Sequence, residues 1–149
     1  MIKDGNYNGK GKMTHANGDC YQGGYLDGKA HGFGVLVDQE GSMYEGDWVE
    51  DVQHGHGVET WNDNGSMRYE GDFLYGKKTG KGQFQHEGSY YQGDFVDGQF
   101  HGTGKYYFAE SGKIYKGDFR DNNIEGSGVM IFPDGKRYDG DFSEGKMHG

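Results

Sequence analysis

Residues 91–104 read YQGDFVDGQFHGTG, and the same arrangement returns along the whole chain. Each copy begins with a tyrosine, any residue and a glycine. The six tyrosines, spaced 23, 25, 22, 24 and 23 residues apart, are Tyr21, Tyr44, Tyr69, Tyr91, Tyr115 and Tyr138. Self-similarity at a nearly fixed spacing of this length indicates an array in which each unit packs mainly against its neighbours.

The first half of each unit has the pattern of a β-strand. Counting the tyrosine as position 0, position 2 is glycine and position 4 is aromatic in every copy. Positions 0, 2 and 4 of an extended strand point to the same face, so the glycine leaves space that a ring can fill. The aromatic residues at position 4 are Tyr25, Trp48, Phe73, Phe95, Phe119 and Phe142. The sequence therefore predicts a row of aromatic side chains on one face.

A turn and a second strand complete each unit. Position 7 is glycine except at Asp51 and Asn122, which also adopt left-handed turns. A Gly-x-Gly pair follows at positions 11 and 13, and then a short extended run such as 105–108 or 129–132. Each unit is thus predicted to be a β-hairpin. No window has the apolar spacing of a helix.

The predicted fold is all-β: an elongated, single, twisted antiparallel sheet of tandem β-hairpins without helices. The predicted array covers residues 5–149. Its units are a second half-repeat at 5–20, repeats at 21–43, 44–68, 69–90, 91–114 and 115–137, and a first half-repeat at 138–149. Half-repeats at both ends suggest a segment of a longer protein, because solenoids have polar capping units at their termini.

This pattern resembles the MORN repeat (membrane occupation and recognition nexus), whose form is Tyr-x-Gly-x-Phe/Trp-x-x-Gly-x-x-x-Gly-x-Gly followed by a glycine turn. Residues 91–104 match it at every defining position, and the resemblance extends over 5–149. It implies roles in ciliary, flagellar and cytoskeletal assemblies, in membrane contacts or in the regulatory parts of lipid kinases. It also supports homodimerisation, which the unpaired strand edges favour as well.

Composition limits the classes of function. Apolar residues make up 32% of the chain, glycine 31 of 149 residues, and the net charge is -9. This acidity excludes the basic patch that nucleic acid requires and disfavours plain electrostatic binding to anionic lipid. The lone Cys20 fits a reducing compartment, and the expected localisation is cytoplasmic, with a cytoskeletal, ciliary or membrane-associated site implied by the resemblance.

The repeated residues favour binding over catalysis, because an active site needs unlike residues that converge once. No catalytic residue, metal site or cofactor is predicted, and the chain is not expected to be an enzyme. Histidines at position 10 (His31, His54, His101, His148) and aspartates at position 3 recur, but equivalent side chains in successive repeats diverge. We therefore interpret the histidines as hydrogen-bonding in hairpins or lying at the surface, and the aspartates as hydrogen-bonding in turns or forming a solvated face. The Gly-x-Gly pairs are interpreted as close-packing glycines.

Two classes of function are predicted from the aromatic face and from the few basic clusters. The first is a protein-protein interaction scaffold that binds a helix, an extended peptide (basic partners being favoured) or a second copy of the chain. Its predicted contact residues are Tyr21, Tyr44, Tyr69, Tyr91, Tyr115, Tyr138, Trp48, Phe73, Phe95 and Phe119. The alternative is a phosphoinositide or membrane-recognition module using Lys77, Lys78 and Lys81, or a regulatory appendage of an enzyme outside this segment.

Overall fold

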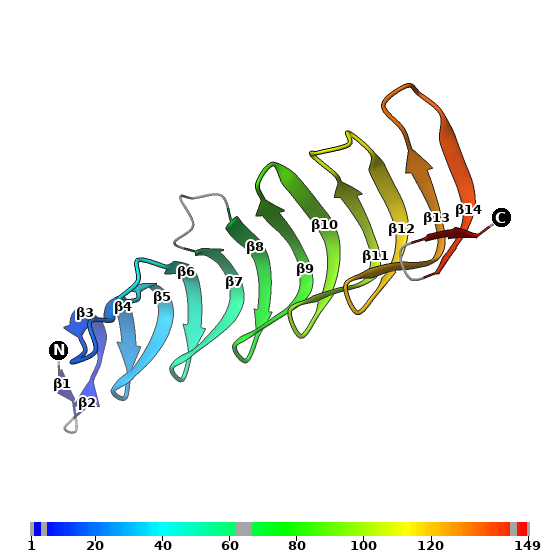
Figure 1. Cartoon of the computed structure of the whole chain (residues 1–149). Coiled ribbons are helices and arrows are strands. Elements are labelled where there is room, and N and C mark those ends of the chain that lie inside the picture. The colour runs from blue at the N-terminus through cyan, green and yellow to red at the C-terminus, as the bar shows by residue number, and fades with distance from the viewer. Residues whose placement is uncertain (1, 4–5, 62–66, 144–145, 149) are drawn as a thin grey trace. The chain divides into compact units, whose positions relative to one another are not determined.

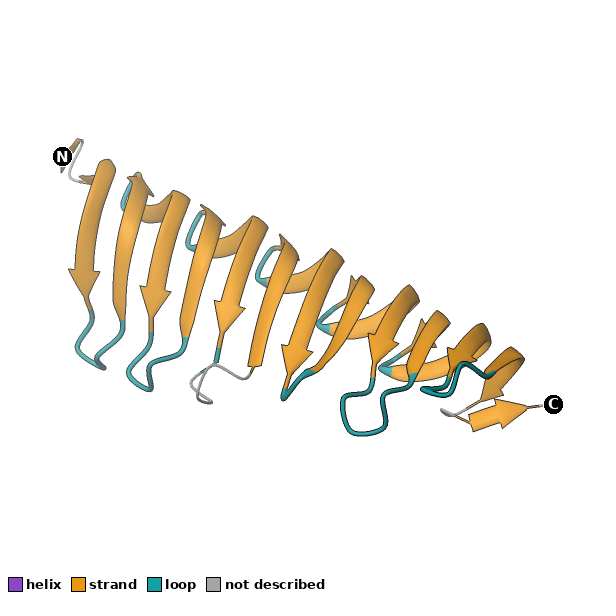
Figure 2. Ribbon diagram, turned by 90° about the horizontal axis from the view of Figure 1, so that it is seen from above, coloured by secondary structure: helices purple, strands orange, loops and turns teal. Residues whose placement is uncertain are grey.

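The fold is described from a computed structural model, which covers residues 2–3, 6–61, 67–143 and 146–148. The chain divides into two compact units, residues 1–77 and residues 78–149. Neighbouring strands are antiparallel within each unit, and their order follows the sequence. The described residues contain no helix (Figure 2), so the predicted all-β fold of tandem hairpins in an antiparallel sheet is confirmed.

Residues 1–77 contain a short strand pair and a series of hairpins (Figure 1). β1 pairs with β2, and β3, β4, β5, β6, β7 and β8 pair in chain order. The strands are β1 (Ile2–Lys3), β2 (Asn6–Tyr7), β3 (Gly9–Thr14), β4 (Cys20–Leu26), β5 (Lys29–Val37), β6 (Met43–Val49), β7 (Val52–Thr60) and β8 (Met67–Leu74).

Residues 78–149 continue with the same alternation of strands and turns, beginning in β9. The strands are β9 (Lys77–His86), β10 (Ser89–Val96), β11 (Gln99–Tyr107), β12 (Ile114–Arg120), β13 (Asn123–Ile131), β14 (Arg137–Ser143) and β15 (Lys146–His148). Within each unit the hairpins curve along their length, as the ribbons of Figure 1 show.

Two-residue turns join the strands of each repeat. In the first repeat Asp27 and Gly28 have φ values of 53° and 81°, and Leu26 pairs directly with Lys29. Positive φ at both central residues defines the type I′ turn, whose twist matches that of the flanking strands. The predicted left-handed turns at Asp51 and Asn122 are confirmed, with φ values of 70° and 72°.

The two glycines of each Gly-x-Gly pair have different roles. The first member, such as Gly32 or Gly126, has a φ of 81° or 83° and lies where the register of its hairpin shifts at a β-bulge. This conformation favours glycine whatever the space around it. The prediction of close packing is confirmed for the second member, such as Gly34. It fails at Gly32, which has open space, whereas a Cβ at Gly126 would lie 2.8 Å from the carboxylate of Asp118.

Four of the second glycines pack directly beneath a tyrosine ring. A Cβ on Gly34 would lie 2.2 Å from the hydroxyl oxygen of Tyr21, and the equivalent contacts of Gly57, Gly104 and Gly128 are 2.3–2.5 Å. Opposite Gly34 stands Gly23, whose Cβ would meet the Cα of Gly34 at 2.4 Å. The two paired glycines thus form the bed on which the ring lies.

The hydroxyl group of each position-0 tyrosine is fixed by a hydrogen bond. In six repeats it donates a hydrogen bond to the carbonyl oxygen three residues further along its own strand, at 2.6–3.2 Å. Because a buried hydroxyl without a partner is costly, this bond allows tyrosine to serve as a core residue. Among the described residues, no buried side-chain polar atom lacks a partner.

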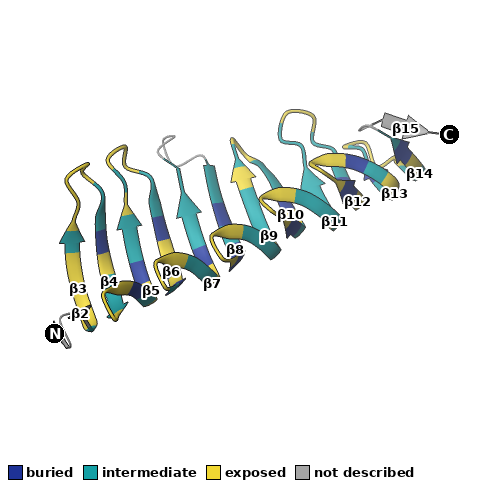
Figure 3. Ribbon diagram, turned by 90° about the horizontal axis from the view of Figure 1, so that it is seen from below, coloured by how far each residue is buried: buried dark blue, intermediate teal, exposed yellow. Residues whose placement is uncertain are grey.

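Edge-to-face aromatic contacts connect each repeat to the next within a unit. The rings of Tyr21 and Trp48 meet at 88° with centroids 5.3 Å apart, and those of Tyr91 and Phe119 meet at 88° and 4.9 Å. These are favourable geometries for aromatic pairs. The core is therefore a continuous row of rings in each unit, which appears in Figure 3 as buried segments along the strands.

We expect Gly34→Ala to destabilise the chain, because the added methyl group would overlap the Tyr21 ring. Overpacking of this kind costs about 1–3 kcal/mol, measurable as a lower urea midpoint by circular dichroism. Gly11→Ala is the matched control: it occupies the same repeat position, but its Cβ would make an ordinary 3.5 Å contact with Tyr25. Equal midpoints for the two variants would contradict the packing argument.

Candidate protein-binding surface

The predicted contact residues form the core of the structure. Tyr69, Tyr91 and Tyr115 are 0% exposed, and the set Tyr21, Tyr44, Trp48, Phe73, Phe95 and Phe119 is 2–6% exposed. Tyr138 is half-buried. Rings packed in this way present little surface to a partner, although Tyr21, Trp48 and Phe119 reach the walls of two hollows. Their burial leaves little ring surface for the predicted contact, and partner binding by the chain stays a prediction.

Burial also sets the acid-base behaviour of these tyrosines. Burial first, and then the charge of Asp118, raises the pKa of Tyr115 to about 12. Burial, followed by the influence of Tyr25 and Asp51, raises the pKa of Tyr21 to about 12. Tyr44, Tyr69 and Tyr91 have pKa values raised further, again mainly by burial. The hydroxyl groups are thus neutral donors over the physiological range.

Part of the side-chain surface beside the tyrosine row comes from the second strand of each repeat. Position 15 lies directly opposite position 0 across the hairpin, as Leu36 opposite Tyr21 and Tyr106 opposite Tyr91 show. Directly opposed residues of antiparallel strands point to the same face. The position-15 side chains are Met13, Leu36, Glu59, Phe84, Tyr106 and Met130. They form a layer beside the tyrosine row on the same face, in which Met130 is itself buried.

Sequence reasoning missed this layer because its residues vary from repeat to repeat. The available signal was the alternation within the second strand, where Tyr106 and Phe108 share one face and Lys105 and Tyr107 share the other. The rings of Tyr106 and Phe108 lie 4.6 Å apart. Tyr107 instead stacks on Tyr90, at 5.6 Å, on the opposite face.

A hollow opens on the aromatic face of residues 78–149, with a volume of about 450 Å³. We call it the Phe108 hollow. Its walls include the side chains of Phe100, Tyr106, Phe108, Phe119, Ile124 and Met130. Of these, Phe100, Tyr106 and Phe108 are half-buried, so apolar surface faces the hollow while the residues stay fixed by their neighbours. Ser111, Lys113 and Asn122 contribute polar groups.

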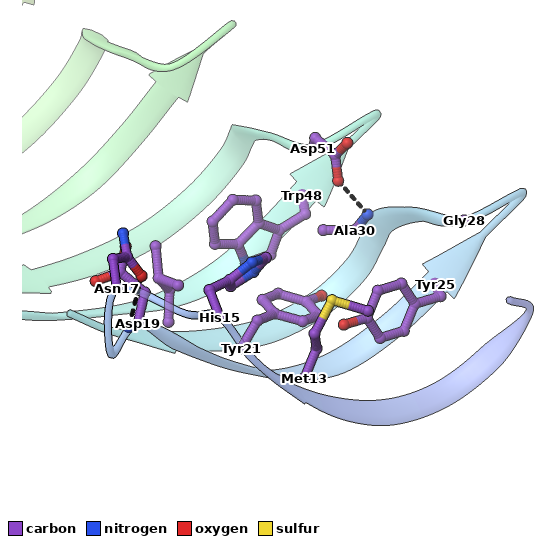
Figure 4. A pocket seen from close by; sticks show the side chains of 11 residues that line it. Met13, His15, Asn17, Asp19, Tyr21, Tyr25, Gly28, Ala30, Trp48 and Asp51 are labelled. Carbon is purple, nitrogen blue, oxygen red and sulfur yellow. Dashed lines mark hydrogen bonds between the residues drawn. The ribbon is translucent and has the colours of Figure 1, made fainter. Parts of the chain in front are cut away.

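A second hollow, of about 430 Å³, lies on the aromatic face of residues 1–77. We call it the Ala30 hollow. Its walls include Met13, Tyr21, Tyr25, Ala30, Trp48 and Asp51. In Figure 4 these aromatic side chains lie on the inner side of the curved strands, and Asp51 stands beside Ala30. The backbone N–H of Ala30 donates a 2.7 Å hydrogen bond to Oδ1 of Asp51.

The predicted lipid-binding lysines do not form a common cluster of free charges. Lys77, Lys78 and Lys81 all belong to β9, where successive side chains point to opposite faces. The ammonium group of Lys81 forms an ion pair with Asp94 and is the first cause of the lowered pKa of that carboxyl group. A lipid headgroup would have to compete with Asp94 for this charge.

Three of the repeated aspartates, Asp47, Asp94 and Asp118, and one of the repeated histidines, His54, accept hydrogen bonds from the backbone. Oδ2 of Asp94 accepts from the N–H of Thr103 at 3.1 Å, and Asp118 contacts Ser127 in the same way. Nδ1 of His54 accepts from the N–H of Tyr75, a bond 3.2 Å long. In the portion of the chain that the structure describes, no three His, Cys, Asp or Glu side chains gather as a metal site.

Comparison with protein-family models supplies the affiliation of the chain. The model of the MORN repeat matches seven segments: residues 2–20, 21–43, 44–66, 69–87, 91–113, 115–137 and 138–149. The chain belongs to the MORN-repeat family. MORN repeats are in general non-enzymatic. A search of curated proteins returned no match to this MORN-repeat chain. The described residues contain no helix that could span a membrane.

The raised tyrosine pKa values predict loss of stability at alkaline pH. An unfolded tyrosine releases its proton near pH 10, whereas Tyr21 and Tyr115 hold theirs until about pH 12 when folded. Their contribution is complete below pH 10 and is lost as the pH rises from 10 to 12. Urea unfolding at pH 8, 10 and 11, with tyrosinate absorbance followed in parallel, tests this.

The exposed Tyr75 supplies the control for the alkaline experiment, since it is 69% exposed. Tyr75→Phe is expected to leave the pH dependence of the urea midpoint unchanged. A midpoint that stays constant from pH 8 to 11 in the wild-type chain would contradict the assignment of the buried hydroxyl groups.

Proposed function

We propose that this chain is a non-catalytic protein-interaction scaffold that binds a segment of another protein through its aromatic face. The observation that carries the proposal is the Phe108 hollow, where half-buried aromatic side chains surround a volume of about 450 Å³. Contiguous apolar surface on a folded chain marks interaction sites, and aromatic anchors dominate the binding energy of interfaces.

The walls of the Phe108 hollow are held in place before any partner arrives. Phe100 stacks on the buried Tyr91 with ring centroids 4.0 Å apart, and Tyr106 lies directly opposite Tyr91 in the hairpin. Tyr91 itself is fixed by its hydrogen bond to the carbonyl of Asp94. A rigid surface loses little conformational entropy on binding, which favours affinity.

Charge favours basic partners over acidic ones. The net charge of -9 accelerates the encounter with a positively charged segment and repels a negatively charged one. A helix or an extended peptide with apolar side chains fits the Phe108 hollow, and basic side chains elsewhere in that partner are favoured by the net charge of the chain. The cytoplasmic localisation expected from the sequence, including a cytoskeletal or ciliary site, belongs to this proposal, as does pairing with a second copy.

We expect Phe108→Ala to weaken partner binding at least tenfold, because it removes a half-buried anchor from the wall of the hollow. Peptides selected on the wild-type chain from a displayed library would be measured by calorimetry against the variant. Tyr107→Ala is the matched control, since Tyr107 neighbours Phe108 but faces the other side of the sheet.

Selected peptides that bind both variants as well as the wild type would contradict the proposal. The phosphoinositide alternative is tested in parallel with vesicles containing phosphoinositide and vesicles of neutral lipid alone. Binding to the first type that disappears in Lys77→Glu/Lys78→Glu would support the lipid function instead.

A further inference from the structure

The Ala30 hollow and the Phe108 hollow occupy equivalent places in their repeats. Trp48 and Phe119 stand at position 4, and Asp51 and Asn122 at position 7 of the same turns. Ala30 and Phe100 stand at position 9 of the preceding repeat. The two hollows therefore share these repeat positions. Their linings differ at several places, and the differences at positions 7 and 9 bear on what each hollow could bind.

The first difference concerns the face of the position-0 tyrosine. Phe100 covers the ring of Tyr91, with centroids 4.0 Å apart and an interplanar angle of 9°. Its counterpart Ala30 carries a single methyl group, so the corresponding space beside Tyr21 belongs to the hollow instead. Tyr25 and Trp48 meet Tyr21 edge-on, at 5.2 and 5.3 Å, and complete an aromatic wall.

The second difference is the charge of the position-7 side chain. Asp51 and Asn122 make the same hydrogen bonds, but only Asp51 is a carboxylate. Asp51 accepts the N–H of Ala30 at 2.7 Å, and Asn122 accepts the N–H of Phe100 at 2.8 Å. The backbone N–H of each returns a 3.0 Å bond to the carbonyl of that same partner. Both side chains serve the fold equally, but Asp51 adds a carboxylate to the aromatic wall of the Ala30 hollow.

The surrounding sequence reinforces this charge. Residues 1–77 contain thirteen acidic and six basic side chains, whereas residues 78–149 contain eleven and nine. Of the net charge of -9, -7 therefore belongs to the part of the chain that holds the Ala30 hollow. A positively charged group is attracted to this part, and a negatively charged group is repelled.

We propose that the Ala30 hollow binds the side chain of a lysine or arginine from the protein partner. The aromatic wall receives the cation and its methylene groups, and Asp51 supplies the opposite charge. The inference rests on the proposed function, since it names the chemistry of one residue of the partner. The Phe108 hollow, with Asn122 and the covering Phe100, lacks both the carboxylate and the open tyrosine face, so the proposal does not extend to it.

The test uses a small probe and does not require the partner. The full chain, labelled with ¹⁵N, is titrated with Nα-acetyl-lysine methylamide and with the norleucine analogue, which lacks the ammonium group. We expect the Trp48 indole N–H and the amide of Ala30 to shift with the lysine probe and not with norleucine. Trp48 is a suitable reporter because its Nε1–H is fixed by a 3.1 Å bond to the carbonyl of Gly34.

Two substitutions test the roles of Asp51 and Ala30 in lysine binding. Each introduces the residue that stands at the equivalent position of the Phe108 hollow. Asp51→Asn copies Asn122, keeps the bond to Ala30 and is expected to weaken lysine binding at least fivefold. Ala30→Phe copies Phe100 and is expected to abolish it. Asp27→Asn is the control: it removes an exposed charge from the preceding turn, outside the hollow, and is expected to leave binding unchanged.

Several results would overturn the inference. One is equal chemical-shift changes with the lysine and norleucine probes, and another is no change with either probe at millimolar concentration. A third is an equal loss of lysine binding in Asp27→Asn and Asp51→Asn, which would indicate diffuse electrostatic attraction. A response to tetramethylammonium without one to lysine would assign the hollow to a choline headgroup. Failure here leaves peptide binding at the Phe108 hollow intact, whereas failure of the Phe108→Ala experiment leaves the lysine titration interpretable.

Discussion

A tyrosine ring lying across two paired glycines is the contact on which the other features of each repeat depend. The ring needs both Cβ positions to be empty, since a methyl group at Gly34 would stand 2.2 Å from the Tyr21 hydroxyl. The hydroxyl then bonds to the carbonyl three residues on. Ring, glycine pair and hydrogen bond fix one another, and the edge-to-face contact with position 4 of the next repeat extends the arrangement.

The fold could be predicted from the residues that recur in every repeat, because each of them meets a local physical requirement. Glycine at position 7, with Asp51 and Asn122 as its substitutes, satisfies the type I′ turn, and aromatic residues at positions 0 and 4 supply the core. The surface could not be derived in the same way. Its residues, such as Tyr106 and Phe108, vary between repeats, because solvent imposes no single side chain at an outer position.

The bulge glycine illustrates the same limit at a finer scale. In the sequence Gly102 and Gly104 form one Gly-x-Gly pair with one apparent purpose. In the structure Gly102 has a φ of 88° and lies against the carboxylate of Asp94, whereas Gly104 lies under the ring of Tyr91. The two glycines differ because the register of the hairpin shifts between them. This shift recurs in the repeats, so comparing one repeat with another in the sequence does not reveal it.

The side-chain bonds between successive turns have a consequence for how such a chain is made. The bonds from Asp51 to Ala30, from Asn122 to Phe100 and from Tyr75 to His54 span 21 or 22 residues. Each of these contacts can form as soon as the following hairpin has left the ribosome, because its two residues are close in the sequence. Within each unit, synthesis and folding can therefore advance together, one hairpin at a time.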